Sequence, residues 1–176
     1  SFVLLDTTES RFKCYSMLTG ALLWTSDSFS DAVWATTWTV YYSATNDNEN
    51  LYVIFSDGTM RAYSLADGHE VWRSEPIPST EYPNNAVPYV IGVVLVDGKL
   101  YGYAGYSQSY QINPVPRFAM TVCIDATNDD TLFTLNGGVR PVAAANGYVI
   151  VTGVFDAKVY CIGKGKTATS VNIQND

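Results

Sequence analysis

The chain has 176 residues, of which 47% are hydrophobic and 15% are charged, so it is long enough to bury a core and too apolar to be disordered. Its formal net charge of −7 disfavours binding to nucleic acid or to an anionic membrane surface, because few cations are present to neutralise phosphates. Thirteen tyrosines and four tryptophans favour β-structure, because aromatic side chains fit pleated, half-buried surfaces.

The first residues, Ser1–Leu5, already read as a strand, and no start Met or secretion leader precedes them. We therefore expect a segment cut or processed from a longer polypeptide, with any export signal or membrane anchor outside it. The sequence holds no apolar run close to the length of a membrane-spanning helix.

A sequence repeat organises the chain. Residues Arg11–Ser26 (RFKCYSMLTGALLWTS) align without a gap with Thr59–Ser74 (TMRAYSLADGHEVWRS). In each copy a strand ends at a Tyr-Ser pair, a short turn contains a Gly, and a second strand carries a Trp, which is the pattern of a β-hairpin. The matched pairs are Tyr15 with Tyr63, Ser16 with Ser64, Gly20 with Gly68, Trp24 with Trp72 and Ser26 with Ser74.

Two further strands precede each later hairpin. In the second unit, Val33–Tyr42 leads to Leu51–Phe55. In the third unit, Val90–Val96 leads to Lys99–Ala104 across Asp97-Gly98, and Asp-Gly between apolar runs is a strong hairpin signal. Each unit is therefore predicted to contain four antiparallel strands.

The third hairpin is degraded and the fourth is incomplete. Met120–Leu135 has Asp129 at the Gly position and Phe133 at the Trp position, which puts the turn of this copy in doubt. The chain has no long window of helical periodicity. The strands expected in the fourth unit are Val142–Ala145, Tyr148–Gly153 and Lys158–Gly163.

These units predict an all-β chain of β-propeller blades with four antiparallel strands each, about three and a half blades of a larger ring. Because a closed ring usually needs four to eight blades, the exposed blade faces should associate with a protein partner or with the remaining blades of the same polypeptide. The expected blades are residues 1–26 (partial), 30–76, 86–136 and 141–163 (partial), within a partial propeller over 1–164, followed by a linker or further segment over 165–176.

The motif Tyr-Ser-x-x-x-Gly-x-x-x-Trp resembles the tryptophan-docking repeat of the quinoprotein-like (PQQ-like) propeller family. That family includes quinoprotein dehydrogenases and a non-enzymatic lipoprotein scaffold of bacterial outer-membrane assembly. The tail from Cys161 resembles large secreted archaeal proteins. The resemblance implies that each Trp packs against the Gly-containing turn of the next repeat. The residues assigned to structural docking are Gly20, Trp24, Gly68, Trp72 and Phe133.

Residues that carry chemistry are sparse. The dehydrogenases of the family have a vicinal Cys pair, a Ca²⁺ held by Glu and Asn, and a catalytic Asp, and no such set is matched here, so we predict no catalytic residue and no cofactor. His69 lies in a tight turn and is expected to be solvated rather than part of a Ser-His-Asp triad. The polar turns Asn46–Asn50 and Asn128–Asp130 carry oxygen ligands suited to Ca²⁺, but we interpret them as hairpin turns and predict no metal site.

Three cysteines share one repeat position. Cys14, Cys123 and Cys161 align with Ala62 of the second copy. A slot filled by Cys or Ala indicates a packing position, so we expect buried thiols. The alternative is a disulfide or metal site, but equivalent positions on different blades should exceed the roughly 7 Å between Cα atoms that a disulfide allows.

The insertion at 105–117 (GYSQSYQINPVPR) is the candidate interaction loop, because extra loops on a rigid scaffold often carry function. Tyr with Gln and Asn suits a glycan or peptide. An equally weighted alternative is a loop that covers a blade edge. The candidate residues are Tyr106, Tyr110, Gln111, Asn113 and Arg117.

The predicted function is that of a non-catalytic propeller scaffold or interaction module of an exported or cell-surface protein, which mediates protein–protein assembly. One alternative is a fragment of a PQQ-dependent quinoprotein dehydrogenase whose cofactor residues lie in other blades. A second alternative is a glycan-binding propeller that uses the Tyr-rich loop.

Overall fold

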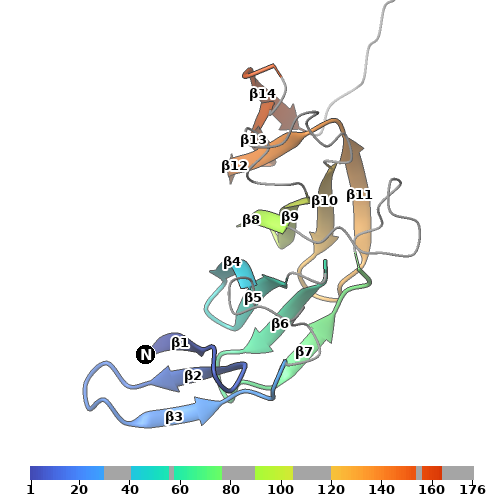
Figure 1. The fold of residues 1–176 in the computed structure, drawn as a ribbon. Helices are drawn as coiled ribbons and strands as arrows, with labels where there is room; N and C mark the ends of the chain where they lie inside the picture. Colours follow the sequence, from blue (N-terminus) through green and yellow to red (C-terminus); the bar gives the residue numbers. More distant parts are fainter. Residues whose placement is uncertain (30–40, 56–57, 77–89, 105–119, 154–155, 164–176) are drawn as a thin grey trace, which may run out of the picture.

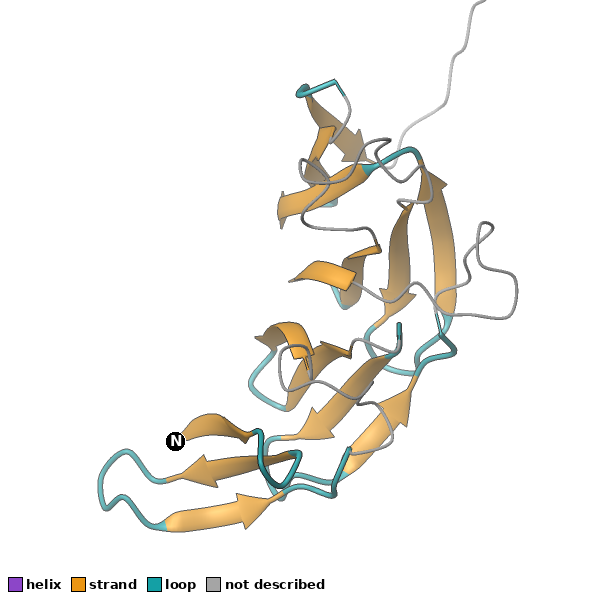
Figure 2. Ribbon diagram, viewed as in Figure 1, coloured by secondary structure: helices purple, strands orange, loops and turns teal. Residues whose placement is uncertain are grey.

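The computed structural model describes residues 1–29, 41–55, 58–76, 90–104, 120–153 and 156–163. These ranges contain fourteen strands and no helix (Figure 2). No helix that is long and apolar enough to cross a membrane occurs in them. In chain order the strands are β1 (Phe2–Asp6), β2 (Arg11–Tyr15), β3 (Leu22–Thr25), β4 (Tyr41–Asn46), β5 (Asn50–Phe55), β6 (Met60–Ser64), β7 (Glu70–Arg73), β8 (Val90–Val96), β9 (Lys99–Ala104), β10 (Met120–Asp125), β11 (Thr131–Asn136), β12 (Val139–Ala145), β13 (Tyr148–Gly153) and β14 (Val159–Gly163).

The strands form four antiparallel sheets that stand side by side in an arc (Figure 1). Each sheet is a meander in chain order: β1–β3, β4–β7, β8–β11 and β12–β14. We call them the first, second, third and fourth sheets. Strands β4, β8 and β12 line the concave side of the arc, and β3, β7 and β11 lie on its convex side. The prediction of an all-β chain built from four-stranded antiparallel units is confirmed.

Strand register makes the sheets equivalent residue by residue. In the first three sheets, the residue at the shared Cys/Ala position pairs with the Trp or Phe on the second strand of its hairpin. It also pairs with a residue of the strand that precedes the hairpin. It follows that β1 corresponds to β5 and β9, so the described part of the first sheet has no counterpart of β4 and β8. The three pairings are Val3–Cys14–Trp24, Tyr52–Ala62–Trp72 and Tyr101–Cys123–Phe133.

A buried serine makes the same two hydrogen bonds at the end of the first and second hairpins. The Ser26 hydroxyl accepts a hydrogen bond from the Phe12 N–H at 2.9 Å and donates one to the Asp27 carbonyl at 2.8 Å. Ser74 does the same with the Met60 N–H and the Glu75 carbonyl, both at 2.9 Å. Both serines are buried, and these bonds satisfy their hydroxyls at the point where the chain leaves the sheet.

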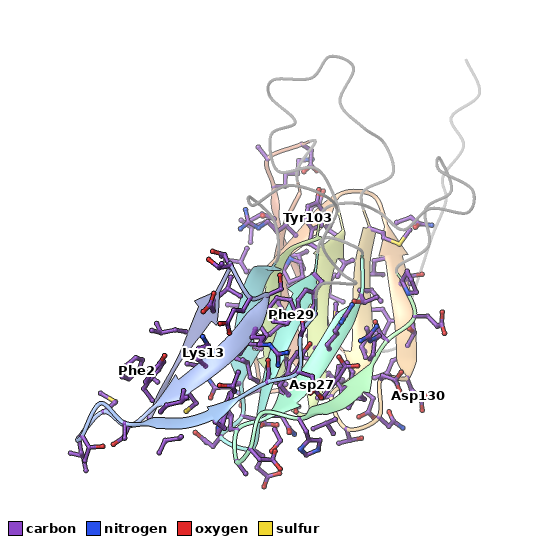
Figure 3. All side chains as sticks on the ribbon, turned by 60° about the horizontal axis from the view of Figure 1, so that its bottom comes forward. Phe2, Lys13, Asp27, Phe29, Tyr103 and Asp130 are labelled. Carbon is purple, nitrogen blue, oxygen red and sulfur yellow. The ribbon has the colours of Figure 1, made fainter. Side chains whose placement is uncertain are left out.

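The core consists of layers between neighbouring sheets. One buried cluster joins the first and second sheets and is rich in aromatic rings, with Phe29 packed 4.9 Å from Phe12 and 5.1 Å from Phe55 between ring centroids. A second cluster joins the second and third sheets around Ile54, Met60 and Leu100. Figure 3 labels Phe29 beside the strands of the first and second sheets, in agreement with this cluster.

Candidate interaction site

Trp24 connects the first sheet to the second. It lies on β3, and its indole Nε1 donates to the Leu65 carbonyl of the second hairpin's turn at 2.9 Å. The ring lies over Gly68, where an added Cβ would be only 2.5 Å from the Trp24 ring. Gly68 also has a φ of +81°, which favours glycine. This turn therefore needs Gly both for its backbone and for its contact with the indole.

Trp72 repeats this arrangement one sheet further along. Its Nε1 donates to the Ala126 carbonyl at 3.0 Å, and Ala126 is the repeat equivalent of Leu65. Its ring lies 5.9 Å from the Tyr52 ring, measured between centroids. Like Trp24, it is 9% exposed. Two indoles thus bridge successive sheets in the same way.

Asp129 does not disrupt the turn of the third copy. Its φ is +63°, and its N–H donates to the Asp125 carbonyl at 3.2 Å, as the Gly68 N–H donates to the Ser64 carbonyl at 2.8 Å. Asp is one of the few non-glycine residues that visits this left-handed region readily. The sequence put this turn in doubt, but the third hairpin has the same turn as the second.

Phe133 stands at the Trp position but is less enclosed than either Trp. It is 38% exposed, and its ring lies 6.2 Å from that of Tyr101 between centroids. Phe133 lines a cavity of about 230 Å³ together with Ile162 and Gly163 of the fourth sheet. Residues 164–176, which follow β14, are outside the described ranges.

Gly20 occupies a turn of the same form on the outer side of the first sheet. Its φ is +70°, and an added Cβ would meet no described atom within 4 Å. The five residues of the candidate loop, Tyr106, Tyr110, Gln111, Asn113 and Arg117, all lie outside the described ranges, so their role stays a prediction.

The outer face of the first sheet is apolar and exposed. Phe2 stacks on Tyr15 with ring centroids 5.6 Å apart, and Phe2 and Leu4 are 41% and 53% exposed. Figure 3 places Phe2 on the side of this sheet that faces away from the other three. The repeat equivalents of Phe2, Leu4 and Tyr15 are Leu51, Val53 and Tyr63, which pack in the core between the first and second sheets.

The lysine on this face is already paired. Lys13 pairs with Asp6 at 2.8 Å and with Glu9 at 3.0 Å. The hydrogen bond to Asp6 is the main cause that raises the pKa of Lys13. Its repeat equivalent, Arg61, is fully buried, with its guanidinium carbon 4.6 Å from the centre of the Phe55 ring. A cation at this position is therefore compatible with a covered face.

The sequence analysis did not single out this outer face. The signal was present in the repeat, because apolar residues of the first sheet align with core residues of the second. Among the described residues, the fourth sheet also has exposed apolar side chains: Val142, Tyr148, Val159 and Tyr160.

The cysteine prediction holds for two residues and is wrong for the third. Cys14 and Cys123 are buried, whereas Cys161 is exposed on β14. All three thiols are free. Burial raises the pKa of Cys123 to about 11, which makes it a weak nucleophile. Cys161 differs because, in the described ranges, no strand covers β14 as β11 covers β10.

The polar turns are organised by their own hydrogen bonds. Asp47 accepts from the N–H groups of Glu49 and Asn50 and from the Tyr52 hydroxyl, the last at 2.6 Å. Although burial alone would raise the pKa of Asp47, these bonds lower it overall. His69 lies 2.6 Å from the Asp67 carboxylate, and both are exposed. No cluster of three or more His, Cys, Asp or Glu residues suited to a metal occurs within the described ranges.

Comparison with known proteins gives the fold. No protein-family profile and no curated protein sequence matches the chain. Among solved structures, the computationally designed proteins Ika4 and Ika8 each superpose with a TM-score of 0.61 at 12% identity over 89% of this chain. BamB from Moraxella catarrhalis superposes with a TM-score of 0.54 at 15% identity over 93% of it.

The fraction of each solved structure that this chain covers differs among the three. This chain covers 81% of Ika4 but only 41% of Ika8 and 42% of BamB, so it spans less than half the length of the latter two. At these identities the likeness shows the fold alone. Together with the four stacked meander sheets, it establishes that the chain folds as adjoining blades of a β-propeller.

Proposed function

We propose that the chain is a non-catalytic propeller scaffold that assembles with another protein segment through the outer face of its first sheet. The observation that carries this is the exposure of Phe2 and Leu4 at positions whose repeat equivalents, Leu51 and Val53, pack between the first and second sheets. A contiguous apolar face of this kind is typical of an interaction surface. The four adjoining sheets, whose fold is similar to that of BamB, support this face.

The apolar content of the face supports a protein partner rather than a polar ligand. Exposed aromatic and aliphatic side chains gain free energy when a complementary apolar surface covers them, at about 25 cal/mol per Å². Lys13 is already paired with Asp6 and Glu9, so covering this face would not bury an unpaired cation.

The proposed location is outside the cell or at its surface. Its support is the resemblance of the repeat motif to exported propellers of the quinoprotein-like family. Fractionation of the source cells, with immunodetection of the native protein, tests this. Retention of the protein with cytosolic markers would contradict the proposed location.

Site-specific photo-crosslinking in the source cells tests the assembly role. A photoreactive phenylalanine analogue replaces Leu4 in one variant and Val71 in another; Val71 is 43% exposed on the outermost strand of the second sheet. We expect crosslinks from position 4 to a defined protein segment, identified by mass spectrometry, and none from position 71. Equal crosslinking from both positions, or none from position 4, would contradict the proposal.

A further inference from the structure

Space remains between the third and fourth sheets. The described clusters of buried side chains join the first sheet to the second and the second to the third. Between the third and fourth sheets, a pocket of about 430 Å³ opens beside β14. This volume is within the range of about 300–1,000 Å³ that is typical of small-molecule sites.

The inner walls of this pocket are aliphatic. Leu135 lies on β11 of the third sheet, and Val139, Val151 and Ile162 lie on the three strands of the fourth. Val151 is fully buried, and the other three side chains are half-buried. An alkyl chain that entered the pocket would therefore exchange contact with water for contact with aliphatic groups, which is favourable.

Hydrogen bonds hold the walls of the pocket in place. The hydroxyl of Thr121, a buried residue of β10, donates to the Val139 carbonyl of β12 and so ties the third sheet to the fourth. In the turn that follows β13, the Gly153 N–H donates to the Lys158 carbonyl at 2.7 Å. The pocket is thus formed before a ligand arrives, which lowers the entropic cost of binding.

The mouth of the pocket carries a carboxylate. Asp156 is exposed, and its carboxylate lies over Gly153, where an added Cβ would collide with Oδ1. It accepts hydrogen bonds from the Tyr160 hydroxyl and from the Lys158 N–H, the latter at 3.1 Å. The bond from Tyr160 is the main cause that lowers the pKa of Asp156, so this group is ionised near neutral pH. Because a carboxylate has about four lone-pair sites, it can accept further donors.

The mouth favours a positively charged head group. Asn136, which is exposed on β11, adds an amide oxygen on the side of the third sheet. No lysine or arginine is among the described residues that line the pocket. An ammonium group donates strong charge-assisted hydrogen bonds to a carboxylate, whereas an anionic head group would be repelled by Asp156.

We propose that this pocket binds a small aliphatic amine, with its alkyl chain between the two sheets and its ammonium group at Asp156. The order of polar mouth and aliphatic interior distinguishes a free amine from the lysine of a polypeptide. A lysine side chain would enter with its ammonium group first and place that charge against Val151, where no acceptor is available among the described lining side chains. The site lies on the third and fourth sheets, so it is independent of the proposed assembly face on the first.

NMR titration of the isotope-labelled full chain tests the proposal with four probes: hexylamine, 1-hexanol, hexanoate and Nα-acetyl-lysine amide. We expect hexylamine to shift the backbone amide signals of Leu135, Val151 and Ile162. Its Kd should be at least about tenfold lower than those of hexanoate and acetyl-lysine amide, because only hexylamine matches both the carboxylate and the aliphatic interior. The neutral 1-hexanol should have an intermediate Kd.

A pair of matched variants locates the head group. Asp156→Asn keeps an acceptor for Tyr160 and Lys158 but removes the charge, so it should raise the Kd for hexylamine about tenfold and leave that for 1-hexanol unchanged. Asp129→Asn removes the same charge from the exposed turn of the third hairpin, outside the pocket lining. It should leave both Kd values unchanged.

Binding of hexanoate or acetyl-lysine amide as tightly as hexylamine would overturn the proposal. So would an equal loss of hexylamine affinity in Asp129→Asn and Asp156→Asn, or the absence of a saturable hexylamine shift at the pocket amides. None of these results would alter the proposed assembly role, which concerns the outer face of the first sheet and is tested by crosslinking from position 4.

Discussion

At the scale of single residues, the bridging tryptophans combine burial with one directed hydrogen bond. Trp72→Phe keeps an aromatic ring but leaves the Ala126 carbonyl without its donor. We expect it to lower the free energy of unfolding by about 1–3 kcal/mol, and Trp72→Ala by about 3–5 kcal/mol because a cavity is added. Equilibrium urea unfolding measures both.

The matched control for this series is Val71→Ala, next to Trp72 on the same strand and 43% exposed. It should change stability by less than about 1 kcal/mol. If Trp72→Phe were as harmless as Val71→Ala, the hydrogen bond to Ala126 would not contribute to holding the sheets together.

The three thiols should separate by reactivity. Cys161 is exposed, whereas Cys14 and Cys123 are buried, and burial raises the pKa of Cys123 to about 11. With a maleimide near neutral pH we expect Cys161 to be labelled first, and the other two only after unfolding, as peptide mass spectrometry would show. Labelling of Cys123 at the rate of Cys161 in the folded protein would contradict the placement of β10.

The repeat predicted a common slot for these cysteines but not the exposure of one of them. Alignment reports which positions are equivalent, whereas burial depends on what covers each sheet. Cys161 has the same place in its strand as Cys14, yet the cover that β3 and its Trp24 provide for Cys14 has no counterpart around Cys161 within the described ranges.

At the scale of elements, the turns decide where the hairpins form. The Asp97-Gly98 and Asn146-Gly147 pairs have positive φ at both residues, 48° and 67°, and 54° and 76°. This is the backbone of a type I′ turn, and such dipeptides favour it because both residues tolerate it. Strands β8 and β9 accordingly have the bounds that the sequence predicted.

Other boundaries were less accessible from sequence. Strand β12 begins at Val139, earlier than the expected Val142, because pairing with β13 extends through Pro141 after a register shift. Similar shifts occur in β4 and β8, between Tyr41 and Ser43 and between Ile91 and Val93. A bulge of this kind changes the face of the sheet on which the following residues lie. The alternation of apolar and polar residues therefore does not show where the strand begins.

The third hairpin turn offers a test at this scale. Asp129 has a φ of +63°, so Asp129→Gly should leave stability within about 1 kcal/mol of the wild type, because relief of backbone strain offsets the greater freedom of the unfolded chain. Asp129→Val should lower it by about 2 kcal/mol or more, because a β-branched side chain resists this region.

Urea unfolding, followed by circular dichroism of the β-sheet signal, measures both variants. Asn is a useful third substitution, since it tolerates positive φ nearly as well as Asp. Equal stability of the Val and Gly variants would mean that the turn is not held at positive φ in solution.

At the scale of the whole molecule, the blade count followed from the repeat, but the way the arc is completed did not. Each hairpin can be predicted from its own turn residues and one aromatic residue. Completion of a ring depends on what covers the outer face of the first sheet and the exposed residues Tyr148 and Tyr160 of the fourth. The repeat sequence does not identify these partners.

Because the sheets stack in sequence, damage to one interface should remain local. The buried clusters join the first sheet to the second and the second to the third, and no described cluster spans more than two sheets. Stability in such stacked architectures is approximately a sum of terms for each unit and its neighbours. Within the described ranges the first sheet has one covered face, so its protection from hydrogen exchange should depend on Trp24.

Trp24→Ala removes both the hydrogen bond to Leu65 and the ring over Gly68. We expect hydrogen exchange, followed by mass spectrometry, to quicken strongly across β1–β3 while β8–β11 keep wild-type protection. Trp72→Ala should instead expose strands on both sides of its interface, β4–β7 and β8–β11. Uniform loss of protection in both variants would mean that the blades unfold as one cooperative unit, since only then would the first sheet transmit its loss to the third.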